Sequence, residues 1–240
     1  MFSLICKENI CDRIEITSNG YLFTKDKVDS ILSSAKTFEG DIYFRFSIYG
    51  ISEEDYKKNC RINASPFVII ENIRYFYEQR NMKKQENVFI YAKKLSTFNN
   101  DDVDFRKMFF SVVDEVALEE PMNWSGAEGK NLLKDAYTKM QIDKICKNSL
   151  PKVCSYPFTN LAINSDGTVV CCCVDWTRGT CVGNINKKSL KDIWYGEKLK
   201  NLRKIHLEGK RYELSCCKNC QQLPRHIMDN LDGVSSEILN

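Results

Sequence analysis

The chain has 240 residues, with 35 Lys plus Arg against 32 Asp plus Glu and 12 cysteines. Because charges of both signs are interleaved, the composition gives no reason to expect nucleic acid or an anionic membrane as a partner. No apolar run approaches the roughly 18 residues of a membrane span, and Met1 to Asn9 lacks a charged-then-apolar leader. A soluble, cytoplasmic protein of one or two domains is therefore expected.

Strand-like and helix-like patterns alternate through the first 120 residues, after a first segment, 1–10, that resembles the end of a helix. The patterns predict strands at 13–17, 41–48, 87–92 and 111–118, and helices at 26–36, 66–80 and 102–109. Strands that alternate with helices favour βαβ units and a parallel sheet. The expected fold class is α/β, with part of a β/α barrel. Asp114 and Glu115 lie on the last strand, where one could face the barrel interior, but carboxylates that are solvated or paired with a helix are expected.

The composition changes after Pro121, where a polar helical stretch at 129–145 ends before Pro151. The segment 121–153 is expected to bridge the barrel-like part and a cysteine-rich part.

Eight of the cysteines lie between Cys154 and Cys220. A hairpin is predicted there, with strands at 160–163 and 168–173 around the turn 164–167. Ser189 is expected to cap a short helix at 190–194, and a second helix at 198–207 leads toward Cys217.

Four cysteines have the arrangement of a metal centre: Cys154, Cys172, Cys217 and Cys220. The last two form a C-x-x-C, which can bind one metal from a single turn while the distant pair completes the ligand shell. Thiols stay reduced inside cells, so ligands are expected here rather than disulfides. A four-iron four-sulfur cluster and a structural zinc ion use the same thiolates, and both remain open.

Neighbouring cysteines leave the ligand choice open. On a strand, Cys172 shares a face with Val170 and Cys171 shares the other face with Cys173, but a bulge could exchange Cys171 for Cys172. Cys216 could likewise replace Cys217. The cysteines left over are expected to be small buried residues: Cys60, Cys146, Cys171, Cys173, Cys181 and Cys216. Asp175 is expected to cap or hydrogen-bond near the centre, whereas His206 and His226 are expected at the surface.

Several motifs resemble the radical S-adenosylmethionine (radical SAM) enzymes that carry a SPASM domain. The segments Ile14 to Gly20, R-F-S-I-Y-G at Arg45 to Gly50 and V-D-E-V-A-L at Val113 to Leu118 resemble successive strands of the partial barrel. Three further motifs resemble the SPASM extension: G-N-I at Gly183 to Ile185, S-L-K-D-I-W at Ser189 to Trp194 and C-x-x-C at Cys217 to Cys220.

The resemblance implies a partial radical SAM barrel at 1–120, a linker helix region at 121–153, a SPASM domain at 154–224 and a tail at 225–240. It implies one auxiliary four-iron four-sulfur cluster, because no second C-x-x-C follows Cys220. The family pattern places the hairpin ligand five residues after Gly167, at Cys172.

The resemblance also exposes a gap, because the chain contains no C-x-x-x-C-x-x-C, the motif that binds the catalytic cluster in the family. About two β/α units are expected to be missing, so that the chain is either a fragment or a degenerate member. By resemblance, Ser18, Asn19, Gly20 and Ser47 lie near S-adenosylmethionine, which is expected only in a full-length form. A plain turn and an ordinary strand serine are the alternatives.

The expected function is that of the C-terminal part of a radical SAM/SPASM oxidoreductase-like protein acting on a peptide, a protein or a sugar-type small molecule. Without the motif, catalysis is uncertain, and the chain alone is not expected to cleave S-adenosylmethionine. The alternative is a non-catalytic iron-sulfur or zinc module that recognises a peptide or a partner protein. A partner chain that completes the barrel is also expected.

Overall fold

The computed structural model describes residues 1–98, 100–119, 151–218, 220 and 229–239. The chain divides into two units, Met1–Glu120 and Pro121–Asn240, and each is described by itself. The helix predicted at 129–145 lies outside the described residues. Within the described ranges, no helix is long and apolar enough to cross a membrane.

The N-terminal unit alternates strands and helices, as the sequence predicts. Its elements are α1 (Phe2–Glu8), β1 (Arg13–Ser18), α2 (Lys25–Ala35), β2 (Asp41–Ser47), α3 (Glu53–Cys60), α4 (Pro66–Met82), β3 (Val88–Leu95), α5 (Asn100–Phe109) and β4 (Glu115–Glu119).

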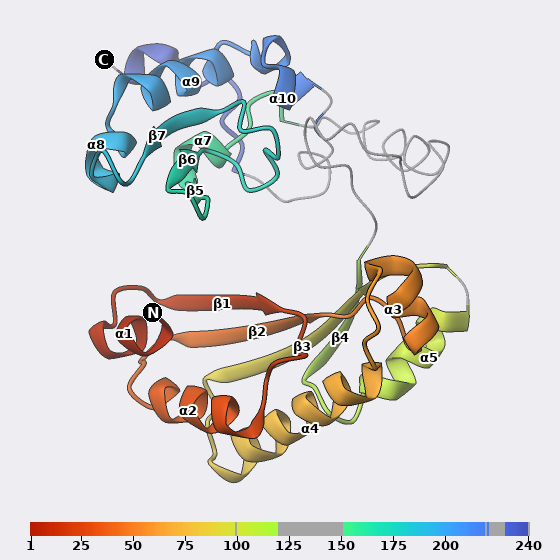
Figure 1. The fold of residues 1–240 in the computed structure, drawn as a ribbon. Helices are drawn as coiled ribbons and strands as arrows, with labels where there is room; N and C mark the ends of the chain where they lie inside the picture. The colour runs from red at the N-terminus through yellow and green to blue at the C-terminus, as the bar shows by residue number, and fades with distance from the viewer. Residues whose placement is uncertain (99, 120–150, 219, 221–228, 240) are drawn as a thin grey trace. The chain divides into compact units, whose positions relative to one another are not determined.

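The four strands form one parallel sheet in the order β1-β2-β3-β4, with Ile14 opposite Ile42 and Ile42 opposite Val88. Helices α2 and α4 run along the same face of this sheet (Figure 1). A sequential parallel order with its helices on one face is how a β/α barrel is wound, whereas a doubly wound sheet has helices on both faces. The predicted α/β class is confirmed.

Aromatic rings fill the space between the sheet and its helices. The rings of Phe44 and Phe76 meet edge to face with centroids 4.8 Å apart, and those of Phe23 and Phe46 with centroids 4.9 Å apart. Phe44, Phe46 and Phe76 are almost fully buried. Removing such large rings from water supplies much of the stability of the unit.

A partly buried ion pair joins α4 to the residue that precedes β4. Nη2 of Arg80 lies 2.6 Å from Oδ1 of Asp114, whose Oδ2 accepts a hydrogen bond of 2.7 Å from the backbone N–H of Ile90. The expected pairing of Asp114 with a helix is confirmed. Strand β4 begins at Glu115 and not at Ser111, because the chain is still turning out of α5, with the Val112 N–H bonded to the Phe109 carbonyl.

Helix α3 lies outside the predicted elements, although its start signal is present in the sequence. Ser52 Oγ accepts from the Asp55 N–H at 3.1 Å, and Asp55 Oδ2 accepts from the Ser52 N–H at 3.0 Å. This reciprocal capping box satisfies donors that a helix start leaves without partners. It compensates for the low apolar content of the helix, in which only Tyr56 is buried.

The other face of the sheet carries polar and aromatic side chains. On this face, the Tyr43 and Phe89 rings stack with centroids 4.8 Å apart, and the Arg13 guanidinium lies 3.9 Å from the centre of the Tyr43 ring. Arg45 Nη1 lies 3.4 Å from Glu15 Oε2. We call this surface the open face, because the helices of the unit cover the opposite one.

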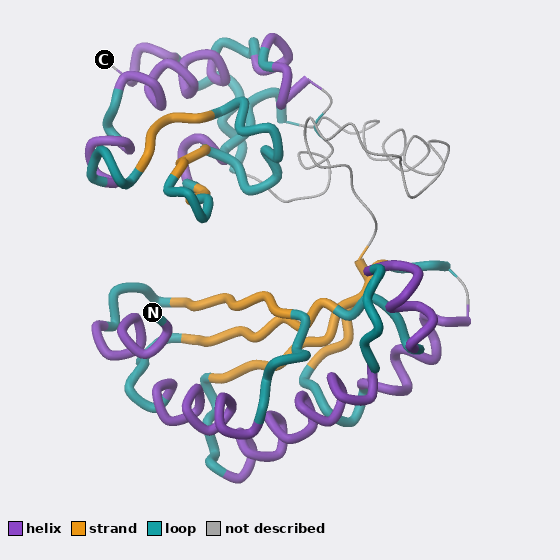
Figure 2. The backbone as a smooth tube through the Cα atoms, viewed as in Figure 1, coloured by secondary structure: helices purple, strands orange, loops and turns teal. Residues whose placement is uncertain are grey.

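The C-terminal unit is built from short elements around a three-stranded antiparallel sheet in the order β5-β6-β7 (Figure 2). Its described elements are α7 (Tyr156–Thr159), β5 (Ala162–Ile163), β6 (Thr168–Val170), β7 (Cys181–Asn184), α8 (Leu190–Trp194), α9 (Glu197–Leu207), η1 (Arg211–Glu213), α10 (Ser215–Lys218) and η3 (Ser236–Leu239).

The predicted hairpin is confirmed, and β7 adds a strand that was not predicted. The predicted cap of α8 is also confirmed, with Ser189 Oγ accepting from the Asp192 N–H at 3.1 Å. Helix α9 packs Leu199 and Leu202 against Val169 and Ile193, and these side chains form the small core of the unit.

Candidate metal centre

Six of the described cysteines line one cavity in the C-terminal unit: Cys154, Cys171, Cys172, Cys216, Cys217 and Cys220. All four predicted ligands are among them, although they come from three separate segments of the chain. Among the described residues, no group of three or more His, Cys, Asp or Glu side chains is arranged so that it could hold a metal ion. The fold therefore gathers the predicted ligands around one space, and their choice remains a prediction.

Cys154 enters the cavity immediately before α7. Its segment is held by Asp232, whose Oδ1 accepts from the backbone N–H groups of Lys152 at 2.8 Å and Val153 at 2.9 Å. Val153 is buried, and burial raises the pKa of the Cys154 thiol. The far end of the chain thus fixes the residue that opens the cysteine-rich segment.

Cys171 and Cys172 follow β6 and do not lie on it. The strand ends at Val170, where its register with β7 shifts. The Cys171 N–H then donates to Thr180 Oγ1 at 3.3 Å. The predicted extension of the strand to Cys173 is wrong, because the strand ends at Val170. The irregularity that could exchange Cys171 for Cys172 is present as the register shift between Val169 and Val170. Both Cys171 and Cys172 therefore line the cavity.

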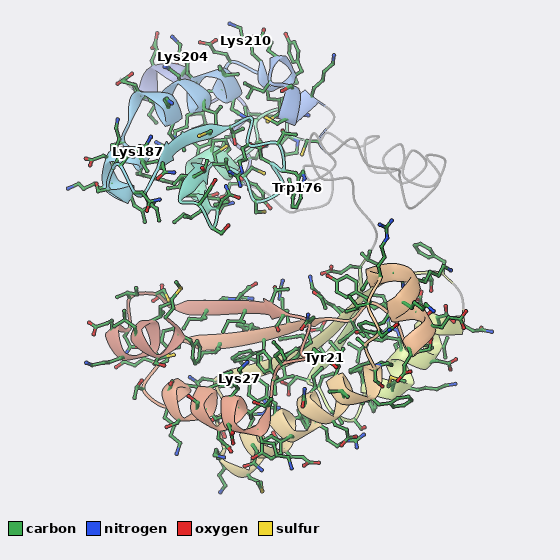
Figure 3. The ribbon with its side chains drawn as sticks, viewed as in Figure 1. Tyr21, Lys27, Trp176, Lys187, Lys204 and Lys210 are labelled. Carbon is green, nitrogen blue, oxygen red and sulfur yellow. The ribbon has the colours of Figure 1, made fainter. Side chains whose placement is uncertain are left out.

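Asp175 organises the loop beside these cysteines, as expected. Its Oδ2 accepts from the Thr180 N–H at 2.7 Å and from Thr180 Oγ1 at 2.6 Å, while Oδ1 accepts from the Gly179 N–H at 3.0 Å. Asp175 is buried, whereas the next residue, Trp176, is 68% exposed and labelled in Figure 3. The carboxylate therefore closes a loop whose tip remains in solvent.

Cys216 and Cys217 lie on α10, with their Sγ atoms 3.8 Å apart. Arg211 Nη1 donates to the Cys217 carbonyl at 3.1 Å and lines the same cavity. Its fixed positive charge suits a centre in which several thiolates bring negative charge together. The C-terminal pair of predicted ligands thus arrives with a cation beside it.

The pKa values of Cys171, Cys172 and Cys217 are raised, whereas contact with Cys217 lowers the pKa of Cys216. Burial raises the pKa of Cys171 to about 12. Contact with the thiol of Cys173, together with burial, raises the pKa of Cys172, and the same contact lowers that of Cys173 to about 6. Contact with Cys216 and burial raise the pKa of Cys217. Since a metal binds the thiolate, a cation that enters this cavity must displace protons.

His206 is a cavity residue that the sequence analysis placed at the surface. It lies in the last turn of α9, is only 1% exposed, and neither ring nitrogen has a hydrogen-bond partner among the described residues. Burial, with the charge of Arg211, lowers its pKa to about 4, so the imidazole is neutral at neutral pH. The signal was its helical spacing from Leu199 and Leu202, which places all three on one face. Lys204, on the same helix, is exposed (Figure 3).

Two of the remaining cysteines also differ from expectation. Cys173 and Cys181 are exposed and not buried, because Cys173 lies on the loop after β6 and Cys181 begins the edge strand β7. Cys60 is half-buried, and Cys146 and His226 lie outside the described residues.

The residues predicted near S-adenosylmethionine do not share one face. Ser47 ends β2 on the open face, because Phe44 and Phe46 alternate onto the helix-covered face. Ser18 and Asn19 form a local turn, in which Ser18 Oγ accepts from the Gly20 N–H at 3.2 Å and Asn19 Oδ1 accepts from the Tyr21 N–H at 3.1 Å. Gly20 is buried and has a φ of 75°, so the turn is bound to the core.

Comparison with known proteins identifies the cysteine-rich segment. Residues 154–221 match the SPASM family, an iron-sulfur cluster-binding domain. The S-adenosyl-L-methionine-dependent 2-deoxy-scyllo-inosamine dehydrogenase of Niallia circulans is 30% identical over 81 residues, which are 34% of this chain and 32% of that protein. The matched region thus spans about a third of this relative.

Two solved structures resemble the chain more distantly. Native anSMEcpe with bound AdoMet matches with a TM-score of 0.49 and 16% identity, over 92% of this chain and 67% of that one. BtrN in complex with AdoMet and 2-DOIA matches with a TM-score of 0.32 and 14% identity, over 88% of this chain and 93% of that one.

Proposed function

Because residues 154–221 of this chain form a SPASM iron-sulfur cluster-binding domain, we propose that they hold one auxiliary four-iron four-sulfur cluster. The proposed ligands are Cys154, Cys172, Cys217 and Cys220. The observation that carries this proposal is the convergence of six thiols from three segments on one cavity.

The donor set fits such a cluster. Thiolates are the soft, anionic ligands that iron-sulfur clusters take, and four are needed. When bound, a cluster of this type supplies a site that can accept or pass one electron. The chain contributes the enclosing walls: the loop closed by Asp175, the Arg211 charge and the apolar core behind Cys171. A structural zinc ion would use the same thiolates, and metal analysis separates the two.

The choice of four ligands among six thiols rests on packing and on the family pattern. Cys171 belongs to the apolar core with Val169 and Leu199 and is 2% exposed, so we assign it a packing role. Cys216 is also buried, against the Gly179 backbone. Cys172 and Cys217, their neighbours in sequence, are less buried and are the proposed ligands.

Paired substitutions test this choice. Anaerobically reconstituted Cys172→Ser and Cys217→Ser are expected to lose iron and visible absorption, whereas Cys171→Ser and Cys216→Ser retain four irons per chain. Loss of the cluster in Cys171→Ser with retention in Cys172→Ser would reverse the assignment for the hairpin. The same comparison decides between Cys216 and Cys217.

We propose further that the chain is the C-terminal part of a radical SAM/SPASM oxidoreductase-like protein. The matched stretch of the Niallia circulans dehydrogenase supports a sugar-type or cyclitol-type small molecule over a peptide or protein as substrate. The parallel sheet with its helices on one face has the winding of a partial β/α barrel. Strands β1 and β4 each pair on one side only within the described residues, which leaves both edges for a partner segment or chain.

The chain as given is proposed not to cleave S-adenosylmethionine, because it contains no C-x-x-x-C-x-x-C. Reconstituted protein, incubated with S-adenosylmethionine and a strong reductant, is expected to release no 5′-deoxyadenosine. Release above a protein-free control would contradict this part of the proposal and leave the cluster assignment intact.

A further inference from the structure

His206 is a buried polar side chain without a hydrogen-bond partner among the described residues. It lines the same cavity as the six thiols, and both of its ring nitrogens lack a hydrogen-bond partner among the described residues. Leaving buried polar atoms unpaired destabilises a fold, so such groups are rare without a ligand or water. Whatever fills the cavity is therefore the natural partner of this imidazole.

The fold holds His206 in place from its own helix. Leu199 and Leu202 lie on the same face of α9 as His206. Leu199 is fully buried, and Leu202 is 8% exposed. Since α9 packs against β7 and α8, the imidazole cannot turn out to solvent without moving the helix out of the core. The packing of the helix thus keeps His206 in the wall of the cavity.

On these grounds, and resting on the proposed function, we propose that the His206 imidazole donates an N–H hydrogen bond to a sulfur of the bound cluster and thereby sets its reduction potential. It acts as a hydrogen-bond donor and not as a ligand, because six softer thiols already surround the cavity and four suffice. A neutral imidazole carries one N–H donor, and both sulfide and thiolate sulfur accept hydrogen bonds.

The physical effect has a definite sign. Reduction adds one negative charge to the cluster, and a hydrogen bond to sulfur stabilises the more negative state. Loss of the donor therefore favours the oxidised cluster and makes the potential more negative. Since the side chain is not a ligand, its removal leaves the iron count unchanged.

The test compares reconstituted full chains by iron content and by midpoint potential in an anaerobic titration. His206→Leu is expected to retain four irons per chain and to show a more negative potential. His206→Gln and His206→Asn keep an amide donor, and at least one should restore part of the shift. The matched control is Lys204→Gln, which changes an exposed residue of the same helix and should leave the potential unchanged.

The outcomes separate this inference from the proposed function. Wild-type protein that binds no iron-sulfur cluster overturns both. If the wild-type protein and His206→Leu bind clusters of the same potential, only the role of His206 is overturned. The same holds if His206→Leu loses iron and the spectrum of the wild-type cluster shows histidine ligation.

A measurement on the intact side chain covers the case in which His206→Leu does not fold. The chain has two histidines, His206 and His226. In reduced His226→Gln protein labelled with ¹⁵N-histidine, His206 is therefore the sole source of a histidine nitrogen signal. A weak nitrogen coupling in pulsed electron paramagnetic resonance supports the hydrogen bond. A strong, ligand-like coupling or no coupling contradicts it.

Discussion

Gly179 faces the thiol of Cys216 so closely that a Cβ built on this glycine would lie 3.0 Å from Sγ and 3.2 Å from Cβ of Cys216. The loop closed by Asp175 and the C-terminal cysteine helix α10 therefore meet in van der Waals contact. This contact brings the cysteines of two distant segments to one cavity.

Gly179→Ala is expected to displace Cys216 by a few tenths of an ångström, and Gly179→Val by more. Because Cys217, a proposed ligand, is the next residue, this displacement should also move its thiol. Under air or chelator, the cluster should therefore be lost fastest in Gly179→Val, more slowly in Gly179→Ala and most slowly in the wild type. The measurement is the decay of visible absorption and of bound iron. Gly209→Ala is the control: Gly209 has a φ of 71° with no atom within 4 Å of the added Cβ, so this variant costs only about 1 kcal/mol of backbone strain. Equal decay in all the variants would show that the contact is unimportant.

Asp175→Asn should loosen the loop that carries Thr180, the acceptor for the Cys171 N–H. The two carboxylate oxygens of Asp175 accept from the N–H groups of Gly179 and Thr180, whereas an amide has only one acceptor oxygen. One of these donors is therefore left unpaired, at a cost of about 1–3 kcal/mol. We expect lower stability in thermal denaturation and weaker retention of iron. Asp166→Asn changes an exposed aspartate of the hairpin turn and should have a smaller effect. A larger effect at Asp166 would contradict the role given to Asp175.

Gly20→Ala is expected to destabilise the N-terminal unit by about 1–3 kcal/mol. The backbone there has a φ of 75°, and the new Cβ would lie 3.1 Å from Ile69 Cγ2 and 3.1 Å from Phe46 Cδ1. Chemical denaturation of the full chain measures the change. Ser47→Ala, on the open face, should change stability by less than about 0.5 kcal/mol, as surface substitutions do. Comparable losses in both would mean that Ser47 has a structural role.

Asp102 predicts a dependence of stability on pH. Its carboxylate binds Lys94 Nζ at 2.7 Å and Ser96 Oγ at 2.6 Å within a buried site. Burial alone would raise the pKa of Asp102, but the hydrogen bonds from Lys94, Ser96 and Thr97 outweigh it and hold this pKa well below its usual range. A depressed folded-state pKa adds stability above the unfolded value of about 3.9, and this stability is lost as the pH falls below it.

Asp102→Asn should therefore be less stable than wild type by about 3 kcal/mol at pH 7, because it leaves the Lys94 charge buried without its partner. The difference in the free energy of unfolding between wild type and Asp102→Asn should decrease as the pH falls from about 5 toward 2. Urea denaturation at several pH values measures it, with Asp104→Asn, an exposed aspartate on the same helix, as control. A gap that stays constant down to pH 2 would contradict the assignment.

Local patterns in the sequence were sufficient for most of the fold. Alternation and helical spacing located β1, β2, α4 and α9 to within a few residues, because each buries one regular face. Helix α3 was missed because its stability comes from the Ser52–Asp55 cap, which carries little apolar signal. The course of the chain after Val170 could not be predicted either, since it depends on a hydrogen bond to Thr180, a residue that the hairpin pattern does not include.

The candidate site was predicted through its cysteines and Asp175, but not through His206. The C-x-x-C spacing is the reason that Cys217 and Cys220 are the predicted ligands, because two thiols at that spacing can bind one metal. His206 could not be placed in the cavity by type alone, since a histidine on a short helix is usually exposed. Its spacing from Leu199 was the relevant signal, and only the packing of α9 shows that this face is the buried one.

The most direct test of the account is the iron, sulfide and zinc content of the anaerobically reconstituted full chain, measured together with its visible absorption. We predict four irons and four sulfides per chain, broad absorption near 400 nm, and loss of both in a variant with Cys154, Cys172, Cys217 and Cys220 changed to serine. One zinc per chain without sulfide, or a cluster that survives in the four-serine variant, would contradict the central claim.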